Sequence, residues 1–250
     1  MLRVRGLAVG YGGEPVVEGL DLEIRTGEFT SLIGPSGSGK TSILRVVTGL
    51  LQPLRGTVEL KVAPGDVGFL FQDDALLPWR TVRQNVALGL RIRDLPPAVV
   101  DDKTEHWLTV LGLDGFGDRY PGQLSGGQRK RTAIAQVLAL EPRLLLMDEP
   151  FAALDAIVRT RLSQELLAWV ERDHLTVLLV THDLDEAISA SDVVCVLGHG
   201  PRATIRARHI VEIPRPRDVL GARRHPAFGP LLQRLWDDLA VELSPAQVAP

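Results

Sequence analysis

The stretch that decides the fold reads Gly34-Pro35-Ser36-Gly37-Ser38-Gly39-Lys40-Thr41. It has the pattern G-x-x-x-x-G-K-T, and both of its flanks agree with that pattern. Residues 29–33 form an apolar run with β-branched members, which is typical of a buried strand, and residues 42–47 continue as a helix. A strand that enters a glycine-rich loop and then opens a helix is the arrangement of a P-loop.

This loop has the chemistry of a phosphate-binding site. Its glycines let consecutive backbone N–H groups point inward, and the helix N-terminus adds unpaired donors and a positive dipole end. Lys40 can reach the β- and γ-phosphates, and the Thr41 hydroxyl can ligate Mg²⁺. A plain glycine-rich turn would need neither side chain. The motif predicts a nucleoside triphosphate site, as in a small kinase, a GTPase or a transport ATPase.

The composition narrows the class of protein. The chain has 250 residues and 45% hydrophobic content, enough for one large domain or for one domain with a helical subdomain. A net charge of −3 and a pI of about 6.1 do not suggest an electrostatic nucleic-acid binder. The start has no signal-peptide pattern, and no run of about 18 apolar residues occurs. We therefore expect a soluble chain whose membrane role, if any, comes through a partner.

The single cysteine, Cys195, lies inside the apolar run of residues 193–197. We expect it to pack as a small buried hydrophobe rather than to act as a reactive thiol. One cysteine allows no internal disulfide, so a reducing compartment is the default.

Two carboxylates follow a second apolar run, residues 144–147, which is typical of a strand buried on both faces of a parallel sheet. Asp148 and Glu149 come at its carboxyl end, where open α/β sheets bind their ligands. We expect Asp148 to hold Mg²⁺, directly or through water. We expect Glu149 to orient or deprotonate an attacking water.

A histidine, His182, follows a third apolar run, residues 176–180. A lone histidine is usually structural. This one falls at the same end of the predicted sheet as the P-loop and Glu149, so we expect it to hydrogen-bond the γ-phosphate or the attacking water.

Two further positions each fit two interpretations. Tyr11 is predicted on a glycine-rich loop, where it is either a surface residue or a ring that stacks on adenine. Ser125, Gly126 and Gly127 precede a predicted helix, and they form either an ordinary serine N-cap or a second anion site. Spacing alone does not separate these alternatives.

The loop of residues 73–80 carries the apolar side chains Leu76, Leu77 and Trp79. These side chains form either a local mini-core or, as we favour, a surface for a partner. A helix that Thr81 caps is predicted directly after the loop.

The last part of the chain is rich in arginine. We interpret residues 202–224 as a solvated basic face, with contact to a partner or to an anionic surface as the alternative. An amphipathic helix is predicted over residues 226–240, and residues 244–250 are expected to be disordered.

The ordered set of motifs resembles that of an ABC-transporter ATPase subunit over nearly the whole chain. The motifs are the P-loop, Gln72, Leu124-Ser125-Gly126-Gly127-Gln128, Leu145-Leu146-Met147-Asp148-Glu149-Pro150, Ala153-Leu154-Asp155 and His182. Each motif alone is moderately specific, whereas six in this order are very specific. The resemblance implies an α/β fold in one domain, residues 1–243. It comprises a P-loop NTPase core with a mostly parallel sheet, an N-terminal antiparallel β subdomain and a helical signature subdomain at about 73–140.

The resemblance also implies ATP and Mg²⁺ as ligands and gives each motif residue a role. Tyr11 would stack on adenine, and residues 34–42, which end at Ser42, would hold the phosphates. The implied metal ligands are Thr41, Gln72 and Asp148. The implied catalytic residues are Glu149 as general base, with His182, Gln72 and Lys40.

Ser125, Gly126, Gly127 and Gln128 would bind the γ-phosphate of the nucleotide that the opposite subunit holds, and Asp155 would contact that subunit's P-loop region. The implied assembly is a head-to-tail dimer of this subunit with two ATP molecules at the interface. The implied partners are a membrane permease and, indirectly, a solute-binding protein, with no nucleic acid. The chain would be peripheral on the cytoplasmic face of the membrane.

A finer resemblance concerns the cargo. Residues 71–82 and the ending over residues 214–236 are similar to importer ATPases for nitrate, sulfonate and taurine, and to related pyrimidine-precursor importers. Lys130, where the family more often has Gln, and Gln136, where it often has Arg, depart from the pattern. We expect any effect of these departures on dimer contacts rather than on catalysis.

Two other functions are less well supported. A soluble ABC-type ATPase that acts on nucleic acid or the translation machinery disagrees with the acidic pI, the single ATPase unit and the lack of a coiled-coil insertion. A non-enzymatic nucleotide-binding regulator would not need Lys40, Asp148, Glu149 and His182 together.

Overall fold

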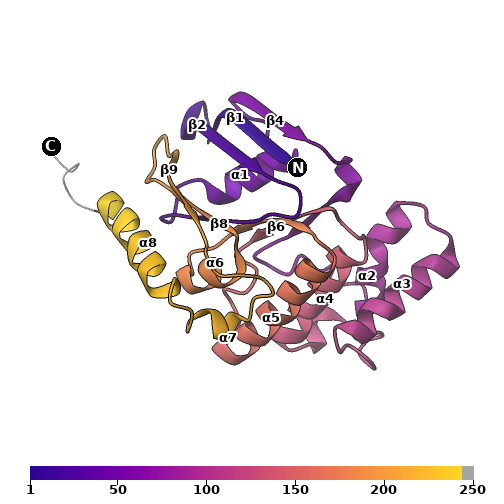
Figure 1. Cartoon of the computed structure of the whole chain (residues 1–250). Helices are drawn as coiled ribbons and strands as arrows, with labels where there is room; N and C mark the ends of the chain where they lie inside the picture. Colours follow the sequence, from indigo (N-terminus) through magenta and orange to yellow (C-terminus); the bar gives the residue numbers. More distant parts are fainter. Residues whose placement is uncertain (244–250) are drawn as a thin grey trace.

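Two sheets organise the chain, of which the computed structural model describes residues 1–243 (Figure 1). The strands are β1 (Leu2–Tyr11), β2 (Glu14–Ile24), β3 (Phe29–Ile33), β4 (Arg55–Leu60), β5 (Val67–Leu70), β6 (Leu144–Asp148), β7 (Thr176–Val180), β8 (Val193–Leu197) and β9 (Ile205–Ile210). The three-stranded sheet has the order β2-β1-β4 and is antiparallel. The six-stranded sheet has the order β5-β6-β7-β3-β8-β9 and is parallel except at β9. The mixed α/β fold with a mostly parallel sheet is confirmed.

Eight α-helices cover these sheets in the described part of the chain. They are α1 (Lys40–Val47), α2 (Val82–Ile92), α3 (Pro97–Val110), α4 (Gly126–Leu138), α5 (Ala156–Arg172), α6 (Leu184–Ala190), α7 (Val219–Ala222) and α8 (Phe228–Leu243). Short 3-10 turns lie at Pro64–Asp66 and Pro121–Gln123. In Figure 1, α2 and α3 lie at one end of the molecule and α8 at the other.

The parallel strands are apolar throughout because both faces of their sheet are covered. Successive side chains of a strand point to opposite faces. Accordingly, Leu144 and Leu146 of β6 pack with α1 and the antiparallel sheet, whereas Leu145 and Met147 pack with the helices on the other side. This is why the run of residues 144–147 shows no alternation with polar residues.

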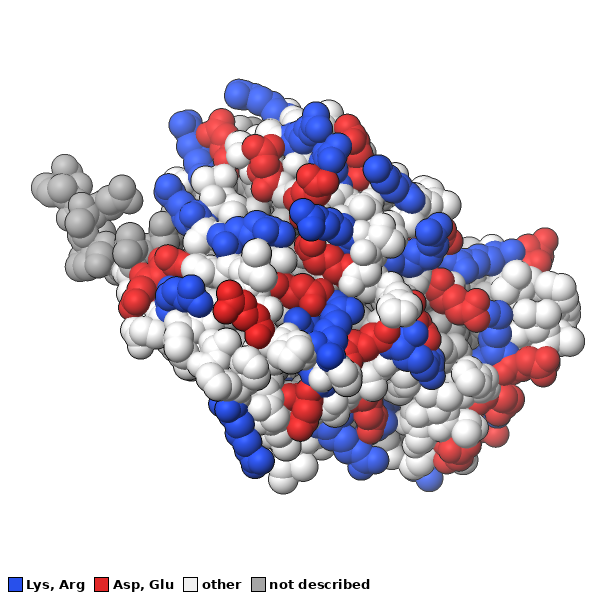
Figure 2. Space-filling view, viewed as in Figure 1, with Lys and Arg blue, Asp and Glu red and all other residues white. Residues whose placement is uncertain are grey.

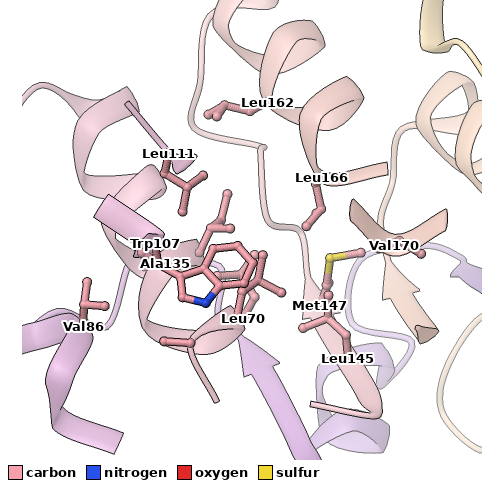
Figure 3. Close-up of a cluster of buried hydrophobic side chains, with 14 of the residues drawn as sticks. Leu70, Val86, Trp107, Leu111, Ala135, Leu145, Met147, Leu162, Leu166 and Val170 are labelled. Carbon is pink, nitrogen blue, oxygen red and sulfur yellow. The ribbon is translucent and has the colours of Figure 1, made fainter. Parts of the chain in front are cut away.

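The layer of helices α2, α3 and α4 packs on β5 and β6 through one cluster (Figure 3). Val86 of α2, Trp107 of α3 and Ala135 of α4 meet Leu145 and Met147 of β6 there. Each of these side chains is buried, and a buried side chain of this size contributes about 1.5–3 kcal/mol. The cluster fixes α4, which follows the motif at Ser125, against the edge of the sheet.

The structure corrects the prediction for the basic stretch of residues 202–224. Arg217 is only 5% exposed, and its guanidinium donates to Asp192 at 2.9 Å and to the Ile213 carbonyl at 3.0 Å. Arg215 also bonds Asp192, at 2.5 Å. Residues 215–217 are therefore held against the body of the protein, rather than forming a solvated face, because both arginines pair with Asp192. We call this segment the strap.

Other predictions hold with shifted ends. The final helix, expected over 226–240, is α8, which spans Phe228–Leu243. Cys195 is buried and free, as expected. The tail of residues 244–250 lies outside the described residues. None of the described helices is both long and apolar enough to cross a bilayer.

Candidate functional site

The P-loop joins β3 to α1, and its glycines are required for their backbone angles or for lack of space beside them. Gly37 and Gly39 have φ angles of 79° and 92°, in the left-handed region that favours glycine. A Cβ on Gly39 would lie 2.4 Å from the Val17 side chain, and one on Gly34 would lie 2.7 Å from the Leu197 carbonyl oxygen. The sheets on both sides therefore confine the loop, as a rigid phosphate cradle requires.

Two polar side chains of this loop fit a phosphate. The Lys40 ammonium donates to the Gly34 carbonyl at 2.7 Å and to the Pro35 carbonyl at 2.8 Å, so it lies over the loop. Burial lowers the pKa of Lys40, while Glu149 and Asp148 act to raise it. The Ser38 hydroxyl is buried and has no hydrogen-bond partner among the described residues. A phosphate oxygen would satisfy this donor.

The predicted metal ligands Thr41 and Asp148 lie together. The Thr41 hydroxyl donates to Asp148 at 3.1 Å, which joins the first turn of α1 to the end of β6. Burial raises the pKa of Asp148, and the nearby charge of Glu149 raises it further. The hydrogen bond from Thr41 acts in the opposite direction and lowers this pKa. Oxygen ligands suit Mg²⁺, which commonly takes one carboxylate together with phosphate oxygens and water. The described residues include no cluster of three or more His, Cys, Asp and Glu that would hold a metal unaided.

Glu149 and His182 form a pair at the ends of β6 and β7. The His182 Nδ1 lies 3.1 Å from a Glu149 carboxylate oxygen, and the Glu149 backbone N–H donates to the Val180 carbonyl at 2.8 Å. Glu149 has a φ of 43°, unusual for a residue other than glycine. Such backbone strain persists where the surroundings impose it, and functional sites are where it concentrates. The structure thus brings together the two residues predicted for proton chemistry.

Glu186 supports the His182 loop, and the sequence analysis did not identify it. The Thr181 hydroxyl lies 2.5 Å from the Glu186 carboxyl, and Asp183 caps α6 by accepting from the Glu186 backbone N–H at 3.1 Å. Burial raises the pKa of Glu186 to about 7, although the hydrogen bond with Thr181 opposes the rise. The residues on both sides of His182 are therefore fixed. The available signal was the acid placed three residues after a helix-capping aspartate.

Tyr11 is the last residue of β1, not part of a loop as predicted, because β1 continues to pair with β2 as far as Glu14. Its hydroxyl lies 3.1 Å from the Ser42 hydroxyl in α1. The side chain is 54% exposed. An accessible ring beside the P-loop helix agrees with adenine stacking, which stays a prediction.

The Ser125 turn caps α4 in the way the simpler interpretation predicts. Ser125 accepts from the Gln128 backbone N–H at 3.2 Å, and the Gln128 side chain accepts from the Ser125 backbone N–H at 2.9 Å. This reciprocal capping box satisfies two N-terminal donors. The anion role of Gly126 and Gly127 at the same turn stays a prediction.

Asp155 lies at the neighbouring helix end. It caps α5 by accepting from the Ile157 and Val158 backbone N–H groups at 3.2 Å and 3.1 Å. A Cβ on Gly127 would lie 3.2 Å from Val158, so the Ser125 turn and the start of α5 are in contact. Among the described residues, no hydrogen bond or ion pair joins residues 34–42 to residues 125–128. The predicted site residues therefore fall into two groups within one chain.

Gln72 is exposed and connects to α4 through its backbone. Its carbonyl accepts from the Lys130 ammonium at 3.0 Å. We expected Lys130 to affect dimer contacts, but its side chain is buried inside its own chain.

The loop after Gln72 fits both interpretations, since one of its apolar side chains packs in the core and another is exposed for a partner. Leu76 packs against the core cluster, whereas Trp79 is 70% exposed. Asn85 of α2 holds the loop by accepting from the Leu77 backbone N–H at 2.8 Å. A groove beside the loop is lined by Phe71, Ala75, Ile92, Gln136 and Leu140.

Several known proteins have sequences similar to that of this chain. Residues 17–152, more than half of the chain, match the family model described as ABC transporter. A bicarbonate transport ATP-binding protein of Synechococcus elongatus is 44% identical over 219 residues, which are 85% of this chain and 33% of that protein. A sulfate/thiosulfate import ATP-binding protein of Nocardia farcinica is 43% identical over 227 residues, which are 88% of this chain and 66% of that protein. The chain thus spans about a third of the first relative and about two thirds of the second.

Solved structures agree with the fold. A dimeric structure of the ATP-binding cassette MJ0796, bound to ADP and Pi, has a TM-score of 0.74 at 29% identity and covers 86% of this chain and 100% of that chain. The cbiO1 structure from Clostridium perfringens, part of the transporter complex cbiONQ, has a TM-score of 0.75 at 25% identity and covers 97% and 98%. ATP and Mg²⁺ are the ligands of such cassettes, and the residues described above fit both. The chain belongs to the ABC transporter family.

Proposed function

We propose that this chain is the ATP-hydrolysing subunit of an importer that moves a small solute through a separate permease. The observation that carries the proposal is the meeting of two pairs, Thr41 with Asp148 and Glu149 with His182, at the carboxyl ends of β6 and β7 beside the P-loop. A phosphate cradle, a metal-binding pair and an acid–base pair at one sheet edge are what ATP hydrolysis requires.

The chain's own residues divide the work. Lys40 and Ser38, with the P-loop backbone, hold the phosphates against the end of β3. Mg²⁺, held by Thr41 and Asp148, would neutralise part of the phosphate charge. Glu149 accepts a proton from the attacking water, and His182, 3.1 Å away, keeps that carboxylate oriented and stabilises the charge that develops.

A head-to-tail dimer accounts for the two groups of site residues. In such a dimer, the Ser125 turn and Asp155 of one copy face the P-loop of the other, so two composite sites form by symmetry. ATP then stabilises the closed dimer and ADP does not, which converts hydrolysis into motion. The solved structure of the cassette MJ0796 bound to ADP and Pi is dimeric, which supports a dimer of this chain by similarity.

The permease would dock at the groove beside the Gln72 loop. Ile92 lines this groove and is 75% exposed, and Trp79 of the neighbouring loop is 70% exposed. Such apolar exposure is typical of a partner surface. Docking at this surface would place the chain on the cytoplasmic face of the membrane. Figure 2 shows acidic and basic side chains interspersed over the visible face, in agreement with a protein partner rather than nucleic acid.

The cargo we propose is a small anion, in the class of nitrate, sulfonate or taurine. The relatives are named for bicarbonate and for sulfate or thiosulfate, which are small anions as well. The solute-binding protein and the permease would bind the cargo and determine its selectivity. This chain would supply the free energy of ATP hydrolysis.

A pair of variants tests the catalytic assignment. Glu149→Gln keeps the volume of the side chain but cannot accept a proton, so we expect ATP binding with a loss of turnover of at least about 100-fold. Lys40→Met removes the positive charge beside the phosphates, so we expect this variant to lose both ATP binding and turnover. Phosphate release and binding of a fluorescent ATP analogue measure the two properties. Normal turnover by Glu149→Gln would remove Glu149 from the mechanism.

A further inference from the structure

A buried lysine joins the loop after Gln72 to helix α4. Lys130 is 3% exposed, and its ammonium contacts three oxygens of that loop. It lies 3.0 Å from the Gln72 carbonyl, 3.4 Å from the Phe71 carbonyl and 3.0 Å from Asp74 Oδ1. All three contacts cross at least 56 positions of sequence, so they tie two separate elements together.

A second cation of the same helix turn completes the arrangement. Arg129 Nε lies 3.4 Å from Asp74 Oδ2, so the two carboxylate oxygens of Asp74 face two consecutive cations of α4. Arg129 also donates to the Leu124 carbonyl at 2.8 Å, directly before the Ser125 turn. We call Asp74, Arg129 and Lys130 the α4 ion cluster.

The position of this cluster gives it two neighbours with different tasks. On one side is the backbone of Gln72, a residue of the chain's own nucleotide site. On the other side, within the same helix turn, is the Ser125 turn. A buried ammonium costs desolvation free energy, and it is retained only where oxygens such as these three compensate for it. Because packed, charge-paired elements resist small deformations, a shift of one neighbour displaces the other.

We propose that the α4 ion cluster is a positioning device that makes the Gln72 loop and the Ser125 turn move as one unit. This inference rests on the proposed head-to-tail dimer. In that dimer, Gln72 serves the nucleotide of its own chain, and the Ser125 turn serves the nucleotide of the partner. The cluster therefore couples the two composite sites, so that nucleotide at one site prepares the other.

The kinetic test uses Lys130→Met in the full-length chain. The methionine keeps the apolar stem and loses the three contacts. We expect the Hill coefficient for ATP to fall from about 2 toward about 1, and kcat to fall about tenfold, because coupling between two sites is lost. Binding of a fluorescent ATP analogue stays unchanged, since in the described part of the chain no hydrogen bond or ion pair of Lys130 reaches residues 34–42. Lys130→Arg, which can donate to the same oxygens, restores much of the cooperativity.

Arg131→Met is the matched control. Arg131 is the next residue of α4, and its guanidinium pairs with Glu165 of α5 at 2.7 Å and 3.2 Å, away from the Gln72 loop. Its loss lowers the thermal stability of the chain but leaves the Hill coefficient as it is. An equal loss of cooperativity in Arg131→Met and Lys130→Met would show a general effect of α4 stability and would overturn the proposal.

A second measurement does not depend on hydrolysis. Backbone amide exchange over residues 71–77 is expected to speed up at least about fivefold in nucleotide-free Lys130→Met, and to stay at the wild-type rate in Arg131→Met. Wild-type exchange in Lys130→Met would refute the cluster, whatever the kinetics. If the wild-type chain itself failed to hydrolyse ATP, the proposed function would fall, and the exchange rates would still decide whether the cluster fixes the loop.

Discussion

Glu186 is an acid whose charge depends on pH near neutrality. Its pKa in the folded chain is raised from 4.5 to about 7, by burial first, with Asp183 adding to the rise and Thr181, Arg159 and His182 opposing it. Between these two values the folded chain holds one more proton than the unfolded chain. The stability that this proton gives is present at low pH and is lost as the pH rises through about 7.

Glu186→Gln is expected to remove this pH dependence, because the amide resembles the protonated acid. The two proteins should have equal stability near pH 4, and the variant should gain at most about 3 kcal/mol over wild type by about pH 8. Urea unfolding across this range measures the difference. Exposed Glu14→Gln is the control and should follow wild type. Parallel curves for Glu186→Gln and wild type would contradict the assignment.

At the residue scale, the sequence predicts site residues from their position along a strand or loop. Lys40, Asp148 and His182 are predicted because each follows a buried apolar run or lies inside a glycine pattern, and their roles stay predictions. The same patterns predict no site role for Glu186 or Lys130. Their environment comes from contacts between separate elements, and neither burial nor partner is visible in a local pattern.

At the scale of elements, the strap that holds the C-terminal part is the least expected feature. Asp192 follows α6. Its carboxylate accepts hydrogen bonds from the side chains of Arg215 and Arg217, and from the Phe29 backbone N–H at 2.8 Å. Burial alone would raise the pKa of Asp192, but these hydrogen bonds and charges hold it below its ordinary value. Its contribution to stability is therefore present above the ordinary aspartate pKa and is lost as the pH falls.

Arg217→Met should destabilise the chain by about 2–3 kcal/mol, because it leaves the Ile213 and Ala190 carbonyls without this donor and removes one of the two cations that pair with Asp192. Thermal or denaturant unfolding gives the value. Arg202→Met is the control on the same basic stretch. Its ion pair with Glu18 is mostly exposed, so a cost of about 1 kcal/mol or less is expected. Equal effects of the two variants would show that the strap is not a structural element.

The sequence predicted which elements exist better than where they end. Continuous apolar runs identified β6, β7 and β8 because a sheet covered on both faces needs apolar residues at every position. Tyr11 was placed in a loop because its glycine neighbours favour a turn, yet β1 extends through it by pairing with β2. Tyr11 pairs with Glu14 across the short turn at Gly12 and Gly13, and the glycines alone do not show where the strand ends and the turn begins.

At the scale of the whole molecule, the groove beside the Gln72 loop tests the proposed permease contact. Ile92 is 75% exposed at the rim of this groove, and a carboxylate there would have to be desolvated on docking. Ile92→Glu should therefore reduce recovery of the permease with this chain from detergent-solubilised membranes at least about tenfold. Ile210→Glu is the control, because Ile210 is 66% exposed on the edge strand β9, and it should leave recovery unchanged. Equal recovery with both variants would place the permease elsewhere.

The proposed assembly rests on two groups of predicted site residues, which no single motif reveals. The P-loop, Asp148, Glu149 and His182 share one sheet edge, whereas the Ser125 turn and Asp155 meet at the starts of α4 and α5. The motifs indicate which residues we predict for the site. The placement of the elements separates them into two groups, which the proposed dimer would bring together.

Sedimentation of Glu149→Gln with different nucleotides tests the central claim most directly. We predict a dimer with ATP and Mg²⁺ and a monomer with ADP, because only ATP bridges the P-loop of one copy and the Ser125 turn of the other. Adding Ser125→Arg to this variant should leave ATP bound and keep the chain monomeric. The same mass with ATP and with ADP, or a dimer that forms despite Ser125→Arg, would contradict the composite site.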